Sequence, residues 1–311
     1  MAEPVALAAL ALDAALGWPA GLYRRVGHPV GGFARLITAC ERRWNRRDVS
    51  DRKRRVLGLI TVVLIGGATA IVTGLADASI KRLAGPAAWP LVAMAAWPAL
   101  AQRSLHDHYL PVLVALERGD LSAARQAVGM IVGRDTGSLD ETGVARAAIE
   151  SLAESFCDGV VAPLFWLLVL GLPGIWAYKA INTADSLIGH PEEPLRAFGW
   201  AAARGDDVLN LIPARLAALL ICLAGGGGWR VLWRDHRKHA SPNAGWPEAA
   251  IAGALGVRLA GPVSYDGELR DKPWIGEGAN ASSSAMRQAR KLFLRACGLL
   301  WMIAGGLAWL A

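Results

Sequence analysis

Two long runs without a charged residue constrain this chain more than any other feature. Residues 56–76, VLGLITVVLIGGATAIVTGLA, and residues 159–178, GVVAPLFWLLVLGLPGIWAY, contain no Asp, Glu, Lys or Arg. An α-helix rises about 1.5 Å per residue, so about 20 residues cross the roughly 30 Å hydrocarbon core of a bilayer. Both runs are therefore predicted to lie in a membrane as helices.

The composition of the whole chain supports the same interpretation. Hydrophobic residues make up 54% of the 311 residues and charged residues 19%, and the mean hydropathy is +0.32. Further apolar segments lie near residues 4–17, 85–101, 211–228 and 296–311. We therefore expect an all-α fold, a polytopic integral membrane helical bundle with polar cytoplasmic loops, in which residues 1–311 form a single membrane-embedded domain.

Positive charge is concentrated in one short stretch. The formal net charge is +7, and residues 41–55, ERRWNRRDVSDRKRR, hold eight basic and three acidic residues. Loops on the cytoplasmic side of a membrane carry such an excess of Lys and Arg, which also attracts anionic lipid headgroups. The stretch predicts a cytoplasmic loop at the surface of a lipid bilayer and argues against a role in nucleic-acid binding.

This loop sets the expected direction of the helices that follow it. If residues 56–76 cross outward and residues 85–101 return, the polar residues 102–158 are cytoplasmic. A simple span over residues 159–178 then places the next polar block, residues 179–210, on the opposite side of the membrane. The two polar blocks would be separated by the bilayer.

Two arrangements bring these polar blocks together. In the first, Pro163 and the Leu172-Pro173-Gly174 sequence interrupt helical hydrogen bonding, so residues 159–178 form a re-entrant or broken helix that lines a protein cavity. In the second, the span is kept and the polar residues 179–185 are buried in the bundle interior. Either arrangement is expected to bring these side chains to the acidic helix that precedes the apolar run.

The acidic helix carries one ionisable face. Arg146, Glu150, Glu154 and Asp158 recur at every fourth position. A solvated face with an Arg–Glu pair, which contributes only roughly 0.2–0.5 kcal/mol, is the structural explanation of this face. For the polar residues 179–215 the structural explanation is a buried ion-pair network that holds helices together. Carboxylates at the entrance of a membrane-length segment usually serve chemistry, because burying them is costly. We interpret this face as one wall of a functional site.

Two polar loops add candidate ligand-binding groups. Arg134, Asp135 and Thr136 offer a cation, a hard oxygen ligand and a hydroxyl, which suit a nucleotide phosphate with magnesium. Asp and Thr also cap helices, which is the structural alternative for this loop. The Gly-rich stretch 261–279 contains Lys272 and backbone N–H groups that suit an anion.

Seven blocks of sequence, taken together and in order, resemble one family, the adenosylcobinamide-phosphate synthases of cobalamin (vitamin B12) biosynthesis, called CobD or CbiB. The blocks are HPV at 28–30, IVGRDTGSLD at 131–140, DGVVAPLF at 158–165, YKAINTADSLIG at 178–189, DDVLNLIPARL at 206–216, SPNAGWPEA at 241–249 with AGALGVRLAGP at 252–262, and DKPWIG at 271–276. They span nearly the whole chain and are far more specific together than any one fragment.

The resemblance implies a catalytic domain, an acid–amine ligase. Such an enzyme joins aminopropanol, or aminopropanol phosphate, to a propionate carboxylate of adenosylcobyric acid, with ATP and Mg2+ required. ATP would activate the carboxylate as an acyl phosphate, and a carboxylate base would remove the proton of the ammonium. A multi-pass protein of the cell inner (cytoplasmic) membrane is also implied, with its active site accessible from the cytoplasm and with other corrinoid-pathway enzymes, or further copies of itself, as partners.

Residue chemistry assigns hypothetical roles within this reaction. The catalytic candidates are Glu150, Glu154, Asp158 and Lys179, where Glu150 or Glu154 takes the amine proton and Lys179 neutralises phosphoryl charge. The substrate-binding candidates are Asn182, Asp185, Asn210, Arg215, His239, Ser241 and Asn243. The nucleotide-binding candidates are Arg134, Asp135, Thr136 and Lys272, and the metal-binding candidates are Asp135, Asp206 and Asp207.

The chain departs from the family pattern at four positions. Trp18 stands where Asp is usual, which puts in doubt any catalytic role for a carboxylate there, and Ser155 stands where Asn is usual. Ala184 and Glu277 replace the commoner Leu and Asp. None of these changes removes the acidic helix face.

Two interpretations from other classes compete with the ligase. A proton-coupled membrane transporter also uses intramembrane carboxylates, but it predicts inverted repeats, and the sequence shows none. A non-catalytic membrane anchor for corrinoid enzymes explains the basic loop but not the many polar blocks. The sequence leaves open whether aminopropanol is free or phosphorylated, whether ATP yields ADP or AMP, and how many chains assemble.

Overall fold

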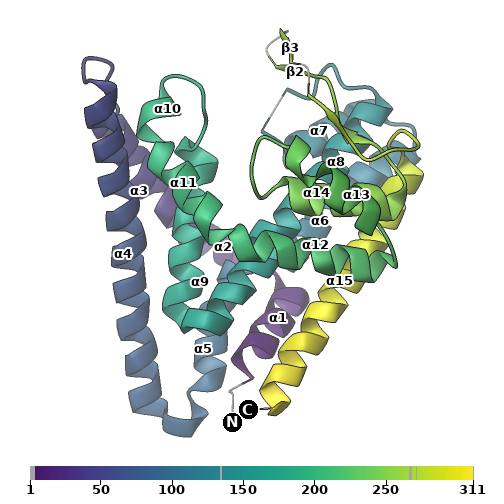
Figure 1. The fold of residues 1–311 in the computed structure, drawn as a ribbon. Coiled ribbons are helices and arrows are strands. Elements are labelled where there is room, and N and C mark those ends of the chain that lie inside the picture. The colour runs from purple at the N-terminus through teal and green to yellow at the C-terminus, as the bar shows by residue number, and fades with distance from the viewer. Residues whose placement is uncertain (1–3, 134, 266–267, 271, 311) are drawn as a thin grey trace. The chain divides into compact units, whose positions relative to one another are not determined.

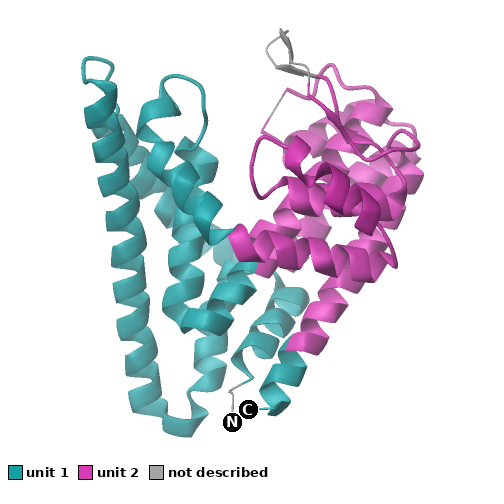
Figure 2. Ribbon diagram, in the orientation of Figure 1, with its two compact units in different colours: residues 1–101, 162–210, 304–311 teal, residues 102–161, 211–303 magenta. Residues whose placement is uncertain are grey.

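The computed structural model describes residues 4–133, 135–265, 268–270 and 272–310. The chain is predominantly helical and divides into two compact units (Figures 1 and 2). Unit 1 consists of residues 1–101, 162–210 and 304–311, and unit 2 consists of residues 102–161 and 211–303. Each unit is therefore built from segments that are far apart in the sequence.

The regular elements of unit 1 are all helices among its described residues. Its elements are α1 (Val5–Leu16), α2 (Ala20–Val26), α3 (Pro29–Trp44), α4 (Asp51–Ala84), η1 (Gly85–Ala87), α5 (Trp89–Ala96), η2 (Trp97–Ala99), α9 (Ala162–Ile188), α10 (Leu195–Phe198), α11 (Trp200–Leu209) and the end of α15 (Ser283–Leu310). His28 begins α3 by accepting a hydrogen bond from the Val30 amide, and Pro29 at the first helical position fits because no donor is needed there.

A close helix approach in unit 1 requires glycine. A Cβ atom at Gly58 of α4 would lie 1.8 Å from the carbonyl oxygen of Phe198 in α10. Phe198 is fully buried and packs with Ile37, Val62 and Ile188, which come from α3, α4 and α9. Apolar side chains from four helices thus fill the core where the two backbones meet.

Helix α9 is broken rather than continuous. Gly171 has φ 67° and ψ −151°, a left-handed region that glycine adopts without a steric penalty. Beyond the break, a Cβ atom at Gly174 would lie 2.4 Å from the carbonyl oxygen of Trp166, whereas residues eight apart in an unbroken helix are separated by about 12 Å. The chain therefore turns back on itself, which agrees with the first of the two arrangements considered for residues 159–178, the re-entrant or broken helix.

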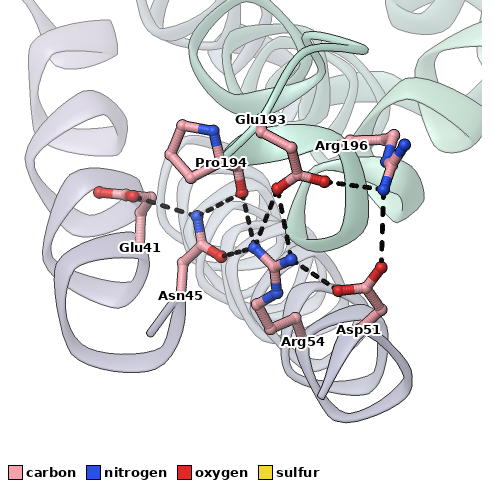
Figure 3. A network of polar contacts seen from close by, with 7 residues as sticks. All are labelled: Glu41, Asn45, Asp51, Arg54, Glu193, Pro194 and Arg196. Carbon is pink, nitrogen blue, oxygen red and sulfur yellow. Dashed lines mark hydrogen bonds and ion pairs between the residues drawn. The ribbon is translucent and has the colours of Figure 1, made fainter. Parts of the chain in front are cut away.

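A polar network ties the basic end of α4 to the loop after α9 (Figure 3). The buried Arg54 donates to the Pro194 carbonyl oxygen at 3.0 Å and to the Asp51 carboxylate at 2.6 Å. It also lies 3.3 Å from the Glu193 carboxylate, and the Asn45 amide donates to the Pro194 carbonyl at 3.0 Å. These contacts join the end of α3, the start of α4 and the segment before α10.

Unit 2 combines helices with four short strands. Its elements are α6 (Gln102–Glu117), α7 (Leu121–Gly129), α8 (Glu141–Phe156), the π-helical turn η3 (Cys157–Val161), α12 (Leu211–Gly225), α13 (Trp229–Asp235), η4 (His236–Lys238), α14 (Gly245–Leu255), β1 (Leu259–Ala260), β2 (Val263–Tyr265), β3 (Glu268–Arg270), β4 (Trp274–Ile275) and most of α15. Strand β1 pairs with β4, and β2 pairs with β3, both antiparallel. Asp140 caps α8 by accepting from the Gly143 amide at 2.7 Å.

The expected fold class is confirmed. Three helical stretches in the described residues, Asp51–Ala87, Glu141–Ile188 and Ser283–Leu310, are long and apolar enough to cross a membrane, and two bent helix pairs raise this number to as many as five. One of these pairs contains α1 and turns by 99° into the helices that follow. In the apolar stretch 85–101, α5 is only 8 residues long, because 3-10 turns that contain proline flank it. The protein is an all-α polytopic membrane protein.

Candidate functional site

The candidate residues of unit 1 gather around one buried carboxylate, Asp206 of α11. Its Oδ1 accepts a hydrogen bond from Asn182 Nδ2 at 3.1 Å, and its Oδ2 accepts one from Asn210 Nδ2 at 2.9 Å. The Tyr178 hydroxyl donates to Asn210 Oδ1 at 3.1 Å. Lys179 lies close enough to attract the Asp206 carboxylate electrostatically. The structure therefore joins the YKAIN and DDVLN blocks in a single network.

The side chains of this network are buried, so their hydrogen bonds are needed to offset the loss of hydration. Tyr178, Asn182, Asp206 and Asn210 are each exposed by 9% or less. A buried carboxylate is tolerated only where donors satisfy it, and here two amide groups do so. Sequence reasoning missed Tyr178, although its position one helical turn before Asn182 places both on the same face of α9.

The other two acids of these blocks have local partners. Asp207 is paired with Arg204 at 3.0 Å on the surface of α11. The carboxylate of Asp185 lies over Gly189 at the end of α9, where a Cβ atom would come within 1.9 Å of Asp185 Oδ1. The expected meeting of residues 179–210 with the acidic helix stays a prediction, because the two segments belong to different units.

In unit 2, the acidic face of α8 is not uniform. Glu150 Oε1 accepts a hydrogen bond from the Ala260 backbone amide at 2.8 Å and lies 4.0 Å from Arg146 Nε. Arg146 also stacks over the Trp274 ring at 5.2 Å, so this pair anchors the strand segment. Glu154, one turn further along, is exposed. The two candidate bases therefore have different surroundings although they share a face.

The predicted phosphate loop folds against α7. Arg134 lies outside the described residues. Asp135 is exposed, and its Oδ1 accepts from the Gly137 amide at 2.9 Å in a tight turn. The Thr136 hydroxyl donates to the Arg125 carbonyl oxygen at 3.0 Å, and Arg125 Nε donates to the Leu139 carbonyl at 2.7 Å. The loop is ordered by its own contacts, and the helix cap is supplied by Asp140.

The SPNAGWPE block forms a second polar cluster in unit 2. Arg215 of α12 donates to Asn243 Oδ1 at 2.7 Å and lies over the Trp246 ring at 4.6 Å, which fixes the plane of its guanidinium. Ser241 Oγ accepts from the amides of Asn243 and Ala244, each at 3.2 Å. Ser241 thus shapes the turn that presents Asn243 to Arg215.

His239 begins this turn, and its surroundings disfavour the protonated form. Its Nδ1 accepts from the Ser241 amide at 3.0 Å, and its Nε2 lies 3.8 Å from the buried Glu248 carboxylate. Burial lowers the pKa of His239, and the positive charge of Lys272 lowers it further. Lys272 is therefore near His239 in unit 2, which brings together two side chains from distant blocks.

Asp235, which was not among the predicted site residues, lies within a cluster of charged side chains. This carboxylate is fully buried and accepts from Arg234 at 2.7 Å, from Lys238 at 2.8 Å and from the Gly276 amide at 2.8 Å. Burial alone would raise the pKa of Asp235, but these hydrogen bonds hold it well below its usual range. In the sequence, Asp235 lies within a basic run, and nothing there distinguishes it from a solvent-exposed carboxylate.

A preformed metal site of protein ligands alone is not part of the described structure. Within the described ranges, no group of three or more His, Cys, Asp or Glu side chains is arranged to hold a metal ion. His106 and His108 of α6 belong to different local contacts, since His106 accepts from Arg290 at 3.0 Å and His108 contacts the Ser104 carbonyl at 2.8 Å.

Comparison with known proteins identifies the family. A model of the CobD/Cbib protein family matches residues 6–293. Proteins named cobalamin biosynthesis protein CobD are similar along almost the whole chain. The one from Rhodobacter capsulatus is 48% identical over 301 residues, which cover 96% of this chain and 94% of the relative. The one from Sinorhizobium sp is 45% identical over 303 residues, covering 94% of each chain. No solved structure matches.

The chain thus belongs to a family of membrane-bound enzymes of cobalamin biosynthesis, and the resemblance read from the seven blocks is confirmed. The family is CobD/Cbib, and its members are adenosylcobinamide-phosphate synthases, which are amide-forming ligases. Corrinoid substrates and a membrane environment follow from this membership.

Proposed function

We propose that the chain joins aminopropanol or aminopropanol phosphate to a propionate carboxylate of adenosylcobyric acid, at the expense of ATP. The observation that supports this proposal most is that unit 2 contains both the loop suited to phosphate and the acidic residues that follow it. The Asp135–Thr136 loop leads directly into the capped helix α8, which carries Glu150 and Glu154, and Asp158 follows in η3 of the same compact unit. Nucleotide chemistry and base chemistry are thereby supplied by neighbouring segments.

The reaction takes place in two steps. A carboxylate oxygen of the corrinoid attacks the γ-phosphorus of ATP, the bond to the leaving ADP oxygen breaks, and an acyl phosphate forms. The amine nitrogen then attacks the acyl carbon, phosphate leaves, and the proton lost by the amine passes to a carboxylate base. Glu154 is the better base of the two candidates, because its side chain is exposed, whereas Glu150 already accepts a hydrogen bond from the Ala260 amide.

Magnesium would be held mainly by substrate phosphates. Mg2+ is commonly bound through one or two carboxylates together with phosphate oxygens, and it neutralises the charge of the transferring group when bound. Asp135 fits this role because its carboxylate is exposed. Asp206 fits less well, since both of its oxygens accept amide hydrogen bonds, and Asp207 is paired with Arg204. Arg134, Thr136 and Lys272 are assigned to the nucleotide around Asp135.

The unit 1 network is assigned to substrate positioning. Asp206 orients the amide groups of Asn182 and Asn210, so it acts through them as a positioning residue. Lys179 supplies positive charge beside this network, and Asp185 lies in the last turn of the same helix, α9. These amides suit the many amide side chains of a corrinoid, because each amide can both donate and accept.

The second cluster of unit 2 is assigned to an anionic substrate group. Arg215 is pre-oriented by Asn243 and Trp246, and a fixed guanidinium fork suits a carboxylate or a phosphate. Ser241 and His239 shape the same turn. This cluster would bind the corrinoid side chains or the aminopropanol phosphate.

The location of the protein is assigned from charge. The basic stretch at residues 41–55 orients the chain with that loop in the cytoplasm. We infer a multi-pass protein of the cell inner membrane whose site opens to the cytoplasm, where ATP is available. Other corrinoid-pathway enzymes and further copies of this chain are the proposed protein partners.

Reconstitution tests the proposed reaction. Purified protein in detergent is given adenosylcobyric acid, Mg-ATP and either aminopropanol or its phosphate, and products are resolved by chromatography. We expect a corrinoid amide with ADP and phosphate in equal amounts, and the preferred amine identifies the substrate. AMP with pyrophosphate would refute the acyl phosphate route. No amide in a folded preparation would refute the ligase, and uptake by sealed vesicles would support a transporter.

A further inference from the structure

Unit 2 contains a cavity of about 220 Å³ to which no role has been assigned. Its walls come from α6, from the end of α7 and from α8. Its polar lining includes the hydroxyls of Ser104, Ser151 and Ser155 and the imidazole of His108, and Met130 and Ile131 contribute apolar surface. Tyr109 also lines the cavity, and its hydroxyl donates to the Met286 carbonyl at 3.0 Å. Sites that enclose a whole drug-sized ligand measure roughly 300–1,000 Å³, so this cavity suits one ring system of a larger molecule.

The chemistry of the lining restricts the ligand. The nine described residues that line the cavity include no Asp, Glu, Lys or Arg. A phosphate needs cationic partners and an ammonium needs carboxylates, so neither group fits here. Hydroxyls, an imidazole and apolar walls suit an uncharged heterocycle that carries donors and acceptors on its edge. Met130, with 76% exposure, offers a thioether of the kind that contacts aromatic rings favourably.

Hydrogen bonds already present favour acceptors in this lining. Nδ1 of His108 lies 2.8 Å from the Ser104 carbonyl oxygen, which can only accept, so in the neutral ring Nδ1 carries the proton and Nε2 is the acceptor. The Ser151 hydroxyl donates to the Ile131 carbonyl at 2.8 Å, which leaves its oxygen as an acceptor. An exocyclic amino group of a ligand can donate hydrogen bonds to these acceptors. A ring carbonyl in the same position cannot, because its oxygen only accepts.

The cavity adjoins the loop assigned to phosphate. Ile131, whose carbonyl is held by Ser151, begins the segment 131–140. The loop returns to the same place, because a Cβ atom at Gly129 would lie 3.2 Å from the Thr136 hydroxyl oxygen. Gly129 directly precedes Met130 of the cavity wall. A ligand that reaches from the cavity to this loop carries a heterocycle at one end and phosphates at the other.

We propose that this cavity binds the adenine base of ATP, with the triphosphate directed to the loop at Asp135 and Thr136. The inference rests on the proposed ATP dependence and specifies where the nucleotide binds. It also predicts that ATP is preferred to GTP, because guanine carries a carbonyl where adenine carries its amino group.

Kinetics of two matched variants test the assignment. Ser155→Leu fills the cavity, while Ser122→Leu makes the same change at an exposed position of α7. We expect Ser155→Leu to raise the KM for ATP about tenfold, with the KM for the amine and kcat at saturating ATP changed less than about twofold. Ser122→Leu should leave all three constants at wild-type values.

Photolabelling supplies a second measurement if Ser155→Leu fails to fold. Wild-type protein is irradiated with 8-azido-ATP, and labelled peptides are identified by mass spectrometry with and without excess ATP. Label protected by ATP within residues 104–109, 130–131 or 151–155 is expected. Label elsewhere, an unchanged KM for ATP in folded Ser155→Leu, or a raised KM for the amine instead would overturn the adenine assignment while leaving the ligase intact. A wild-type enzyme that consumes no ATP would overturn both.

Discussion

Replacing Asp235 measures how much one buried carboxylate stabilises unit 2. Its side chain has 0% exposure, and it joins α13 and η4 to the end of β4 through Arg234, Lys238 and the Gly276 amide. Asp235→Ala leaves that amide without its acceptor. A buried donor that loses its partner costs about 2 kcal/mol. The charged ends of Arg234 and Lys238 are partly exposed and become hydrated, so they add little to the loss.

The expected result is a lower melting temperature. A loss of about 2 kcal/mol lowers Tm by roughly 4–8 °C in a unit of this size. Thermal unfolding of the protein in detergent, followed by tryptophan fluorescence, measures the shift. The matched control is Glu277→Gln, which removes the other carboxylate that pairs with Arg234 but has 70% side-chain exposure. Exposed ion pairs contribute little, so this variant should unfold like wild type.

Acid unfolding checks the same reasoning. The folded pKa of Asp235 lies below that of the unfolded chain, about 3.9. The unfolded state therefore binds more protons as pH falls below about 4, so the stabilisation by Asp235 is present above this pH and is lost on acidification. Asp235→Asn should flatten this loss. A Tm for Asp235→Ala no lower than that of Glu277→Gln would refute the account of a buried, charge-stabilising cluster.

Three further results are expected. Glu154→Gln should abolish turnover with Tm unchanged, whereas Glu150→Gln should lower Tm because Glu150 accepts from the strand segment; equal loss of folding in both would refute the division of roles. Arg54→Met should destabilise the folded protein by about 2 kcal/mol, unlike Arg196→Met at an exposed position, as measured by thermal unfolding. Because the folded pKa of His239 is lowered, stability should fall as pH drops below about 6.5, and His239→Gln should reduce that dependence.

Patterns that repeat along the chain were predictable from the sequence. The charge-free runs predicted membrane helices. The spacing of four residues between Arg146 and each following acid predicted α8, because helical periodicity places such residues on one face. Proline and glycine after residue 159 made a break one of two alternatives, and the structure has a break at Gly171. Each of these inferences needs only local geometry.

Contacts between distant segments were not predictable in this way. Glu150 and Glu154 are equivalent in the sequence, and only the amide of Ala260, 110 residues away, distinguishes them. Asp206 was predicted from the sequence as a candidate metal ligand, and nothing in the sequence indicated that Asn182 and Asn210 donate hydrogen bonds to its two oxygens. Asp235 lies between basic residues, which gave no sign that its carboxylate is enclosed. Non-local folding decides these environments.

The charge of Arg54 acts differently during membrane insertion and after folding, because Arg54 is buried in the folded protein. Of the eight basic residues between 41 and 55, Arg54 alone is buried, while its neighbours Arg52, Lys53 and Arg55 are exposed. During insertion the chain is still unfolded, so all eight charges act together on the orientation of this segment, for which we propose the cytoplasmic side. After folding, Arg54 is enclosed by its protein partners, and anionic lipid headgroups meet only the remaining seven. A charge count thus describes the biogenesis of the loop, whereas burial describes the surface that the mature protein presents to the membrane.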